Sequence, residues 1–307
     1  DAEAHEEFPR IMDDDLESID RERLIELVIG GGLWPLIREL PFRDAARPEE
    51  RPSAVFVPLD NLDPFHPLPR VYLEGRERLL SFGLRVLERL AGHPPVVTLC
   101  REHAAGIGNH PGWNIRELTG HYPAHDPGVL LYRTKTAADQ NHAWFIDGQD
   151  LLMVAELLKF GRFPTHRIVT LGGPAALHAQ HYRIRLGAPL SALAHGRRAA
   201  GEVRLAAGGV LTGSPAPMGS YLGLLEKALV LLPEGNASGG FLAWTLPGAR
   251  SPSYSRAFLS SFRRAREFPL DCNRHGGRRA CIQCNFCTQV CPVDILPQLT
   301  YKAILAG

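Results

Sequence analysis

Residues 54–58 read AVFVP and residues 95–100 read PVVTLC, and these two short apolar runs decide the fold. The first run lies between Pro52 and Asp60, which is typical of a short strand buried on both faces. Between the two runs, leucine and valine recur at helical spacing over residues 75–91. A buried strand, a helix and a second buried strand in succession predict a parallel sheet with crossover helices.

The same alternation continues along the first half of the chain. Helices are predicted at residues 21–29 and 148–160, and a further strand at 166–171 ends at Gly172-Gly173-Pro174. Asp20 is expected to cap the first of these helices, and residues 43–51 are predicted to form a polar loop. We therefore expect residues 21–176 to form an α/β domain with a doubly wound parallel sheet, preceded by an acidic linker at residues 1–20.

The pattern changes after Pro174. Strands are predicted at residues 182–186, 228–232 and 241–245, with a strand pair or one long strand at 202–211, around one short helix at 189–195. This combination predicts a small β-grasp domain over residues 177–250. Helices at 255–262 and 293–305 flank a cysteine-rich loop, so residues 251–307 are expected to form a helical domain around a metal cofactor.

Composition excludes several classes of function. The formal net charge is +1, so the totals do not indicate a nucleic-acid partner. The longest apolar runs, at residues 151–155 and 228–232, are far too short to span a bilayer, so the sequence predicts no transmembrane segment. Five of the 6 cysteines lie within residues 272–291, which favours a metal cofactor in a reducing compartment over a disulfide scaffold.

Residues 281–292 read CIQCNFCTQVCP, which is the bacterial ferredoxin spacing C-x2-C-x2-C-x3-C-P. Tetrahedral zinc sites usually divide their ligands between two distant pairs. Cysteines three residues apart can rarely meet the geometry of a disulfide. The spacing therefore predicts a [4Fe–4S] cluster held by Cys281, Cys284, Cys287 and Cys291.

The fourth ligand stays open at this point. Cys272 precedes the run and is an alternative to Cys291, because the last cysteine of such a run can ligate a different cluster. Cys100 ends a predicted buried strand and is interpreted as a small core residue.

Other candidate motifs carry less information. Gly106, Gly108 and Gly112 have the spacing G-x-G-x-x-x-G and do not match the dinucleotide-binding fingerprint. The turn at Gly172-Gly173-Pro174 has the residues that a tight turn requires. The loosely grouped histidines show no shared helix face and are interpreted as surface or core residues: His103, His110, His121 and His125.

Many short stretches together resemble the A subunit of the sodium-translocating NADH:quinone oxidoreductase (Nqr) and, more distantly, the C subunit of the related Rnf complex. The most specific are RERLIEL and GLWPLIR within residues 21–42, LGGP and RLGAPL within 161–190, and LTGSPA at 211–216. Further matches lie at residues 54–64, 102–110, 220–222, 232–235 and 241–248. The resemblance implies a missing N-terminal barrel-sandwich domain, then a Rossmann-like domain, a soluble-ligand-binding β-grasp domain and a C-terminal helical domain.

The cysteine run departs from this resemblance. The Nqr relative usually lacks it, whereas residues 271–291 look like an insertion of the kind found in the Rnf relative. There the first cysteine run is followed by another, so the resemblance allows a second cluster beyond Gly307. The glycine-rich flavin and NADH loop of the Rnf relative and of complex I is not found in this sequence.

The resemblance implies a peripheral subunit at the cytoplasmic face of the bacterial inner membrane, in contact with the other subunits of an Nqr/Rnf-like complex. Its cluster would relay single electrons in an NADH:quinone oxidoreductase, with hydride chemistry elsewhere in the complex. Two alternatives are kept. In one, the chain is a docking subunit whose cluster is structural; in the other, it is a quinone-binding module that uses residues 106–110 or 172–174.

Overall fold

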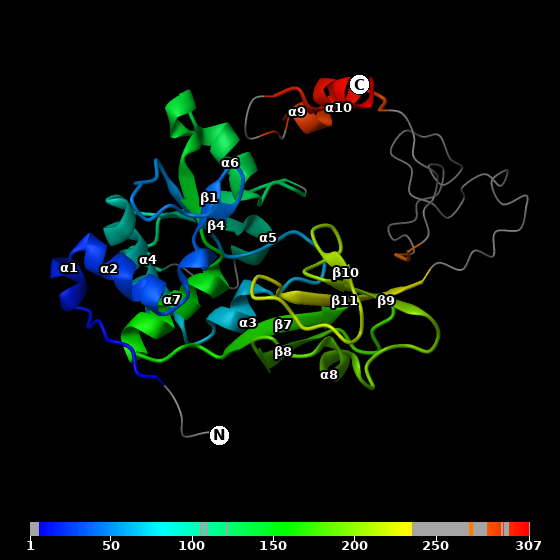
Figure 1. Ribbon diagram of the computed structural model, residues 1–307, viewed down its shortest axis with the longest axis horizontal. Coiled ribbons are helices and arrows are strands. Elements are labelled where there is room, and N and C mark those ends of the chain that lie inside the picture. The colour runs from blue at the N-terminus through cyan, green and yellow to red at the C-terminus, as the bar shows by residue number, and fades with distance from the viewer. Residues whose placement is uncertain are drawn as a thin grey trace, which may run out of the picture. The chain divides into compact units, whose positions relative to one another are not determined.

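The computed structural model describes residues 6–104, 107, 110–120, 122–234, 270–272, 281–289, 291 and 295–306 (Figure 1). The predicted strand at 241–245 and the predicted helix at 255–262 lie outside the described residues, as do Gly106, Gly108 and His121. The chain forms two compact units: the first runs to Ile168 and also includes residues 183–185 and the C-terminal residues from Ile282, and the second includes the residues between.

The first unit is built on a mainly parallel sheet. Its described strands follow the order β2-β1-β6-β3-β4-β5. Strand β3 pairs in parallel with both β4 and β6, and β4 pairs in parallel with β5. Strand β1 is antiparallel to β6 and to β2. The bounds are β1 (Arg38–Leu40), β2 (Asp44–Ala45), β3 (Val55–Pro58), β4 (Val96–Cys100), β5 (Ile115–Leu118) and β6 (Ala143–Phe145).

Helices cover both faces of this sheet, which confirms the expected α/β class. On one face, Leu130 and Leu131 of α6 pack with Phe56 of β3. Because side chains alternate along a strand, Val55 and Val57 point to the opposite face, where α7 contacts β3. The helices of this unit are α1 (Asp15–Ser18), α2 (Arg21–Gly30), α3 (Pro69–Leu73), α4 (Glu77–Ala91), α5 (Arg101–Ala104), α6 (Pro127–Thr134) and α7 (Gly148–Phe160), with short 3-10 turns η1 (Trp34–Leu36) and η2 (Ala138–Asn141).

Helices α2, α4 and α7 contact one another (Figure 1) and contribute many of the buried apolar side chains of this unit. Leu80, Val86, Leu87 and Leu90 of α4 are fully buried. At Gly83 the two longest helices approach closely, because a Cβ there would lie 2.9 Å from Cγ of Leu151 in α7. Apolar burial on this scale supplies most of the free energy of folding.

Three details of the sequence prediction were wrong. Strand β7 (His166–Gly172) does not join the first sheet but pairs in parallel with β11 in the second. The parallel strand expected from it is supplied by β6, which is too short to show a periodic pattern. Residues 43–51 contain the short strand β2, and the Asp20 side chain makes no capping hydrogen bond to α2.

The second unit contains a second sheet. Its described strands follow the order β10-β9-β11-β7-β8, with β11 antiparallel to β9 and β9 antiparallel to β10. The bounds are β8 (Gln180–Arg185), α8 (Leu190–Ala194), β9 (Val203–Ala207), β10 (Ser214–Ala216) and β11 (Ala228–Pro233). Strands β8, β9 and β11 and the short helix α8 agree with the sequence prediction for residues 177–234, whereas strand β10 is not predicted.

In the part of the chain that the structure describes, the helices fall short of the length and apolar character needed to cross a membrane.

Gly173 provides a direct test of how β7 leaves the second sheet. Its φ is +102°, and an added Cβ would meet the Leu231 carbonyl oxygen and lie 2.8 Å from Cγ1 of Val230. Gly187 also has a positive φ, +67°, but an added Cβ there would meet nothing within 4 Å. We expect Gly187→Ala to cost about 1–2 kcal/mol of unfolding free energy, as left-handed backbone requires. Gly173→Ala should cost at least twice as much.

Urea unfolding of the two variants measures this difference. Equal losses of unfolding free energy in Gly173→Ala and Gly187→Ala would show that the turn after β7 is not crowded by β11.

Candidate functional site

The cysteine run begins as a loop and enters a short helix. Residues 281–285 precede α9 (Phe286–Gln289), and α10 (Pro297–Ala306) follows. Gln283 and Asn285 have φ values of 57° and 63°, so each Cys-x2-Cys interval contains one left-handed residue. Left-handed residues turn the chain sharply. The loop therefore curls as it passes from one predicted ligand to the next.

The four predicted ligands differ in exposure. Cys284 and Cys287 are exposed, Cys281 is half-buried and Cys291 is buried; none of them forms a disulfide. Cys272, the alternative ligand, is half-buried, and its backbone N–H donates to the Pro233 carbonyl at 3.1 Å. Burial raises the pKa of the Cys272 thiol, whereas the charge of Arg204 lowers it.

Gln298 of α10 ties the loop to its helices. Its Oε1 accepts a hydrogen bond from Oγ1 of Thr288 at 2.7 Å and from the Cys287 thiol at 3.7 Å. Its Nε2 donates to Oδ1 of Asn285 at 3.1 Å. The sequence prediction missed Gln298, because an isolated glutamine on a helix carries no spacing signal.

The residues of the run fit an iron–sulfur cluster in their donor chemistry. All four are thiols, the ligand type that iron–sulfur clusters take from proteins. Within the described residues, the group of three metal-ligating side chains with donor atoms inside 4.8 Å of one another is Glu39, Glu50 and His142, so no three of the thiols come as close together as this. A cube binds each thiolate at a different iron, so it does not need its ligands to lie as close together as a single ion does.

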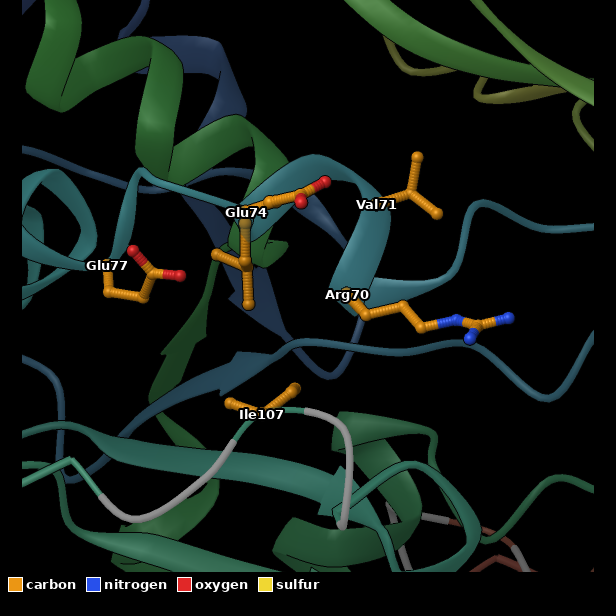
Figure 2. Close-up of a pocket in the computed structure, with 6 residues that line it drawn as sticks. Arg70, Val71, Glu74, Glu77 and Ile107 are labelled. Atoms are coloured by element: carbon orange, nitrogen blue, oxygen red, sulfur yellow. The ribbon is translucent and has the colours of Figure 1, made fainter.

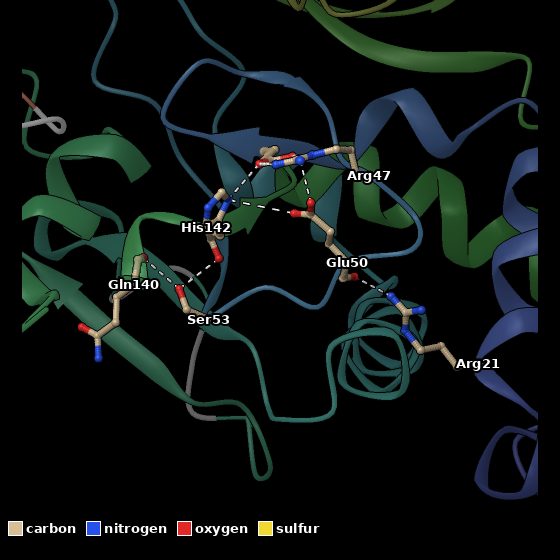
Figure 3. A network of polar contacts seen from close by, with 7 residues as sticks. Arg21, Arg47, Glu50, Ser53, Gln140 and His142 are labelled. Carbon is tan, nitrogen blue, oxygen red and sulfur yellow. Dashed lines mark hydrogen bonds and ion pairs between the residues drawn. The ribbon is translucent and has the colours of Figure 1, made fainter. Parts of the chain in front are cut away.

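The group of Glu39, Glu50 and His142 is an ion-pair network (Figure 3). Arg47 lies between the carboxylates, at 2.6 Å from Oε1 of Glu39 and 2.5 Å from Oε1 of Glu50. The hydrogen bond from Arg47 lowers the pKa of Glu39, and His142 Nδ1 contacts the same carboxylate at 3.2 Å. Because the guanidinium already compensates the carboxylates, this group has no need of a metal ion.

A second polar group lies at the carboxyl edge of the parallel sheet. Asp60 follows β3 with its side chain 2% exposed. Its Oδ2 accepts hydrogen bonds from the backbone N–H of Cys100 at 2.9 Å and from Nδ1 of His103 at 2.7 Å. Burial, with a smaller contribution from the charge of Asp60, raises the pKa of Cys100 to about 12. Cys100 is thus the buried core residue that the sequence predicts, but His103 is a partner of Asp60.

Other titratable groups surround this pair. The imidazole of His66 lies 3.9 Å from the carboxylate of Asp63. Burial lowers the pKa of His125, while the charges of Asp126 and Asp60 raise it. Within the described residues, the buried atoms Asp60 Oδ1 and His125 Nδ1 have no hydrogen-bond partner. By contrast His110, stacked on Trp113, uses its Nε2 to contact the Ile107 carbonyl at 2.7 Å.

His103 lines one of two cavities that share Arg70. One of 260 Å³ is lined by His103 and Glu102 of α5 together with Leu68, Pro69 and Arg70. The other, of 440 Å³, also has Arg70 in its wall (Figure 2). Its remaining lining residues are Val71, Leu73, Glu74, Glu77 and Ile107. The turn at residues 172–174, a possible ligand site from the sequence, instead packs on Val230 and Leu231.

Comparison with known proteins gives consistent matches. The family profile described as "NqrA second alpha/beta domain" matches residues 19–163, and "NQRA C-terminal domain" matches residues 168–217. The A subunit of the Na(+)-translocating NADH-quinone reductase of Serratia proteamaculans (strain 568) is 31% identical over 304 residues, 98% of this chain and 67% of that protein. Its counterpart in Klebsiella pneumoniae (strain 342) is 28% identical over 303 residues, with the same shares.

A solved structure also aligns, at a lower level. A chain of the NAD+-reducing [NiFe]-hydrogenase in the air-oxidised state gives a TM-score of 0.49 at 12% identity, covering 73% of this chain and 51% of that one. This likeness is too low to establish a shared fold.

The exposure of the thiols predicts their reactivity when no cluster is bound. At pH 8 we expect iodoacetamide to alkylate Cys284 and Cys287 first and Cys100 last, because only about one Cys100 thiol in ten thousand is ionised when its pKa is about 12. The rate of alkylation at Cys100 should keep rising as the pH is raised above 9, which is the ordinary pKa of a cysteine thiol. Peptide mass spectrometry measures each site. Equal rates at Cys100 and Cys284 in the folded chain would contradict this, and guanidinium chloride should abolish the difference.

Proposed function

The chain belongs to the NqrA family, the A subunits of the Na(+)-translocating NADH-quinone reductase, and on this basis we propose that it relays single electrons within such an oxidoreductase complex. The chain spans about two thirds of the relatives' length, with 98% of it aligned to a protein of that name. The observation that carries the relay is the ferredoxin spacing at residues 281–292 on this family's framework.

The proposed ligands are Cys281, Cys284, Cys287 and Cys291. A [4Fe–4S] cluster held by them supplies reversible one-electron transfer. The exposed thiols of Cys284 and Cys287 put one side of the site within reach of a redox partner. Gln298 holds the loop against α10 through Asn285 and Thr288, which limits the movement of the ligands.

Hydride transfer from NADH takes place elsewhere in the complex in this proposal, because no glycine-rich flavin or nicotinamide loop is found in the sequence. The chain works at the cytoplasmic face of the membrane and docks on the other subunits. Exposed apolar side chains near the cysteine run support such docking: Ile282 is 84% exposed, Ile304 74% and Leu305 67%. Apolar groups gathered on a surface are typical of an interaction site.

One observation favours a second candidate function, a docking subunit with a structural cluster. Neither α9 nor α10 contains a buried residue among those described, so these helices have little apolar packing of their own. Metal–ligand bonds can supply folding free energy directly. A cluster in this place would then hold the two helices together.

Replacing Cys284 with serine tests the cluster and separates the two roles. After anaerobic reconstitution we expect about four iron ions per chain and an EPR signal on reduction. Both should be lost in Cys284→Ser and retained in Cys100→Ala, the matched control outside the run. Zinc in place of iron, with no EPR signal, would overturn the cluster proposal.

The same Cys284→Ser variant in the whole complex distinguishes relay from docking. Relay predicts that the complex assembles and quinone reduction falls by about two orders of magnitude or more, because the electron path is interrupted. The structural role predicts that the variant chain no longer assembles with its partners.

The fourth ligand is tested by Cys291→Ser against Cys272→Ser. We expect Cys291→Ser to lose most of the iron and Cys272→Ser to retain it, because Cys291 belongs to the ferredoxin spacing. Iron content and the EPR line shape measure the difference. Loss of iron in Cys272→Ser alone would reverse the assignment.

A further inference from the structure

The cavity beside Asp60 and His103 has the position of a ligand site. In open α/β sheets, ligands bind outside the carboxyl ends of the parallel strands. Asp60 follows the carboxyl end of β3, and Glu102 and His103 follow that of β4. Its volume of 260 Å³ lies just below the usual 300–1,000 Å³ for small-molecule sites. The cavity therefore suits a ligand about the size of a sugar phosphate.

The buried carboxylate fixes how His103 faces a ligand. Asp60 is held by the N–H of Cys100 and accepts the Nδ1–H of His103 at 2.7 Å. With the proton on Nδ1, the other ring nitrogen of a neutral imidazole is left as an acceptor. The ring lines the cavity, and within the described part of the chain its hydrogen bond is made through Nδ1. His103 Nε2 can thus accept a hydrogen bond from a hydroxyl group.

Two charged side chains complete the lining. Glu102 is exposed on the same short helix and offers two further acceptor oxygens. Arg70 is exposed on α3 and makes no hydrogen bond or ion pair to the described part of the chain. A guanidinium without a partner is well suited to a phosphate, which it can contact through two N–H groups. Leu68 and Pro69 provide an apolar wall.

The order of the strands suggests which ligand group Glu102 binds. The parallel strands run β5-β4-β3-β6 across the sheet, so β3 is flanked by the next strand in sequence and by the last. In doubly wound folds of this order, an acidic residue after the second strand accepts a ribose hydroxyl. Glu102 occupies that place. The glycine fingerprint that usually binds the phosphate is missing between β3 and α4, where Arg70 lies instead.

We propose that this cavity binds a ribose phosphate, free or as part of a nucleotide. Glu102 and His103 accept hydrogen bonds from the vicinal hydroxyls, and Arg70 binds the phosphate. In a nucleotide, the base would extend into the adjoining 440 Å³ cavity, which shares Arg70 and has Val71 and Ile107 as apolar walls (Figure 2).

Calorimetric titration of the full chain tests this site with four probes: AMP, adenosine, 2′,3′-dideoxy-AMP and ribose 5-phosphate. We expect AMP to bind about tenfold or more tightly than adenosine and than the dideoxy compound, as one charge-assisted hydrogen bond allows. Arg70→Gln should remove the preference for AMP over adenosine and leave the preference for AMP over the dideoxy compound unchanged. Glu102→Gln should reduce the preference for AMP over the dideoxy compound and leave the preference for AMP over adenosine unchanged. Arg78→Gln, an exposed arginine of α4 outside both cavities, is the matched control.

Each outcome decides. AMP at least tenfold tighter than ribose 5-phosphate identifies a nucleotide, and equal affinities identify the sugar phosphate. No saturable binding of any probe at millimolar concentration overturns the proposal, as does binding that Arg70→Gln and Glu102→Gln leave unchanged while circular dichroism shows them folded. The titration is repeated with Cys284→Ser, and unchanged binding there shows that the cavity binds its ligand whether or not the cluster forms.

Discussion

The parallel pairing of β3 with β4 on one side and β6 on the other positions most of the first unit. It requires crossover connections, and α4, between β3 and β4, and α6, between β5 and β6, are two of the helices that these contain. It also brings the carboxyl ends of three strands to one edge, so that Asp60, the amide of Cys100 and His103 meet. Asp60 is nearly fully buried there, and a buried carboxylate is tolerated only when hydrogen bonds replace its water. The two hydrogen bonds that Oδ2 of Asp60 accepts hold together the loops that border the 260 Å³ cavity.

Sequence predicts the long, periodic elements of this chain well and the short ones poorly. Helix α7 has the predicted bounds, and α4 begins two residues late, because apolar residues repeated over three or more turns leave little ambiguity. Strand β6 has only three residues, too few to show a periodic apolar pattern. The sequence prediction therefore places the apolar run of β7 in the first sheet, at the position that β6 occupies. Nothing local distinguishes the two, since β7 is directed to the second sheet by pairing with β11, more than fifty residues away.

The candidate sites divide in the same way. The cysteine run is read from spacing alone, because its ligands are neighbours in sequence and their separations carry the chemistry. Asp60 and His103 are separated by 43 residues and meet only through the sheet, so the sequence could present them only as isolated residues. Gln298 is similar, since its contacts with Asn285 and Thr288 depend on how α10 returns to the loop. The fold class and the cluster hypothesis can therefore be predicted from the sequence, whereas the contacts among the polar groups at the sheet edge can be found only in the structure.

We propose that this chain carries electrons within its complex through a cluster on residues 281–291. The most direct measurement is rapid freeze-quench EPR of the assembled complex after mixing with NADH. An electron relay predicts a reduced iron–sulfur signal, from a site on this chain, that appears within one turnover and decays when quinone is added. A cluster that stays oxidised through many turnovers, while quinone is reduced at the full rate, would contradict it.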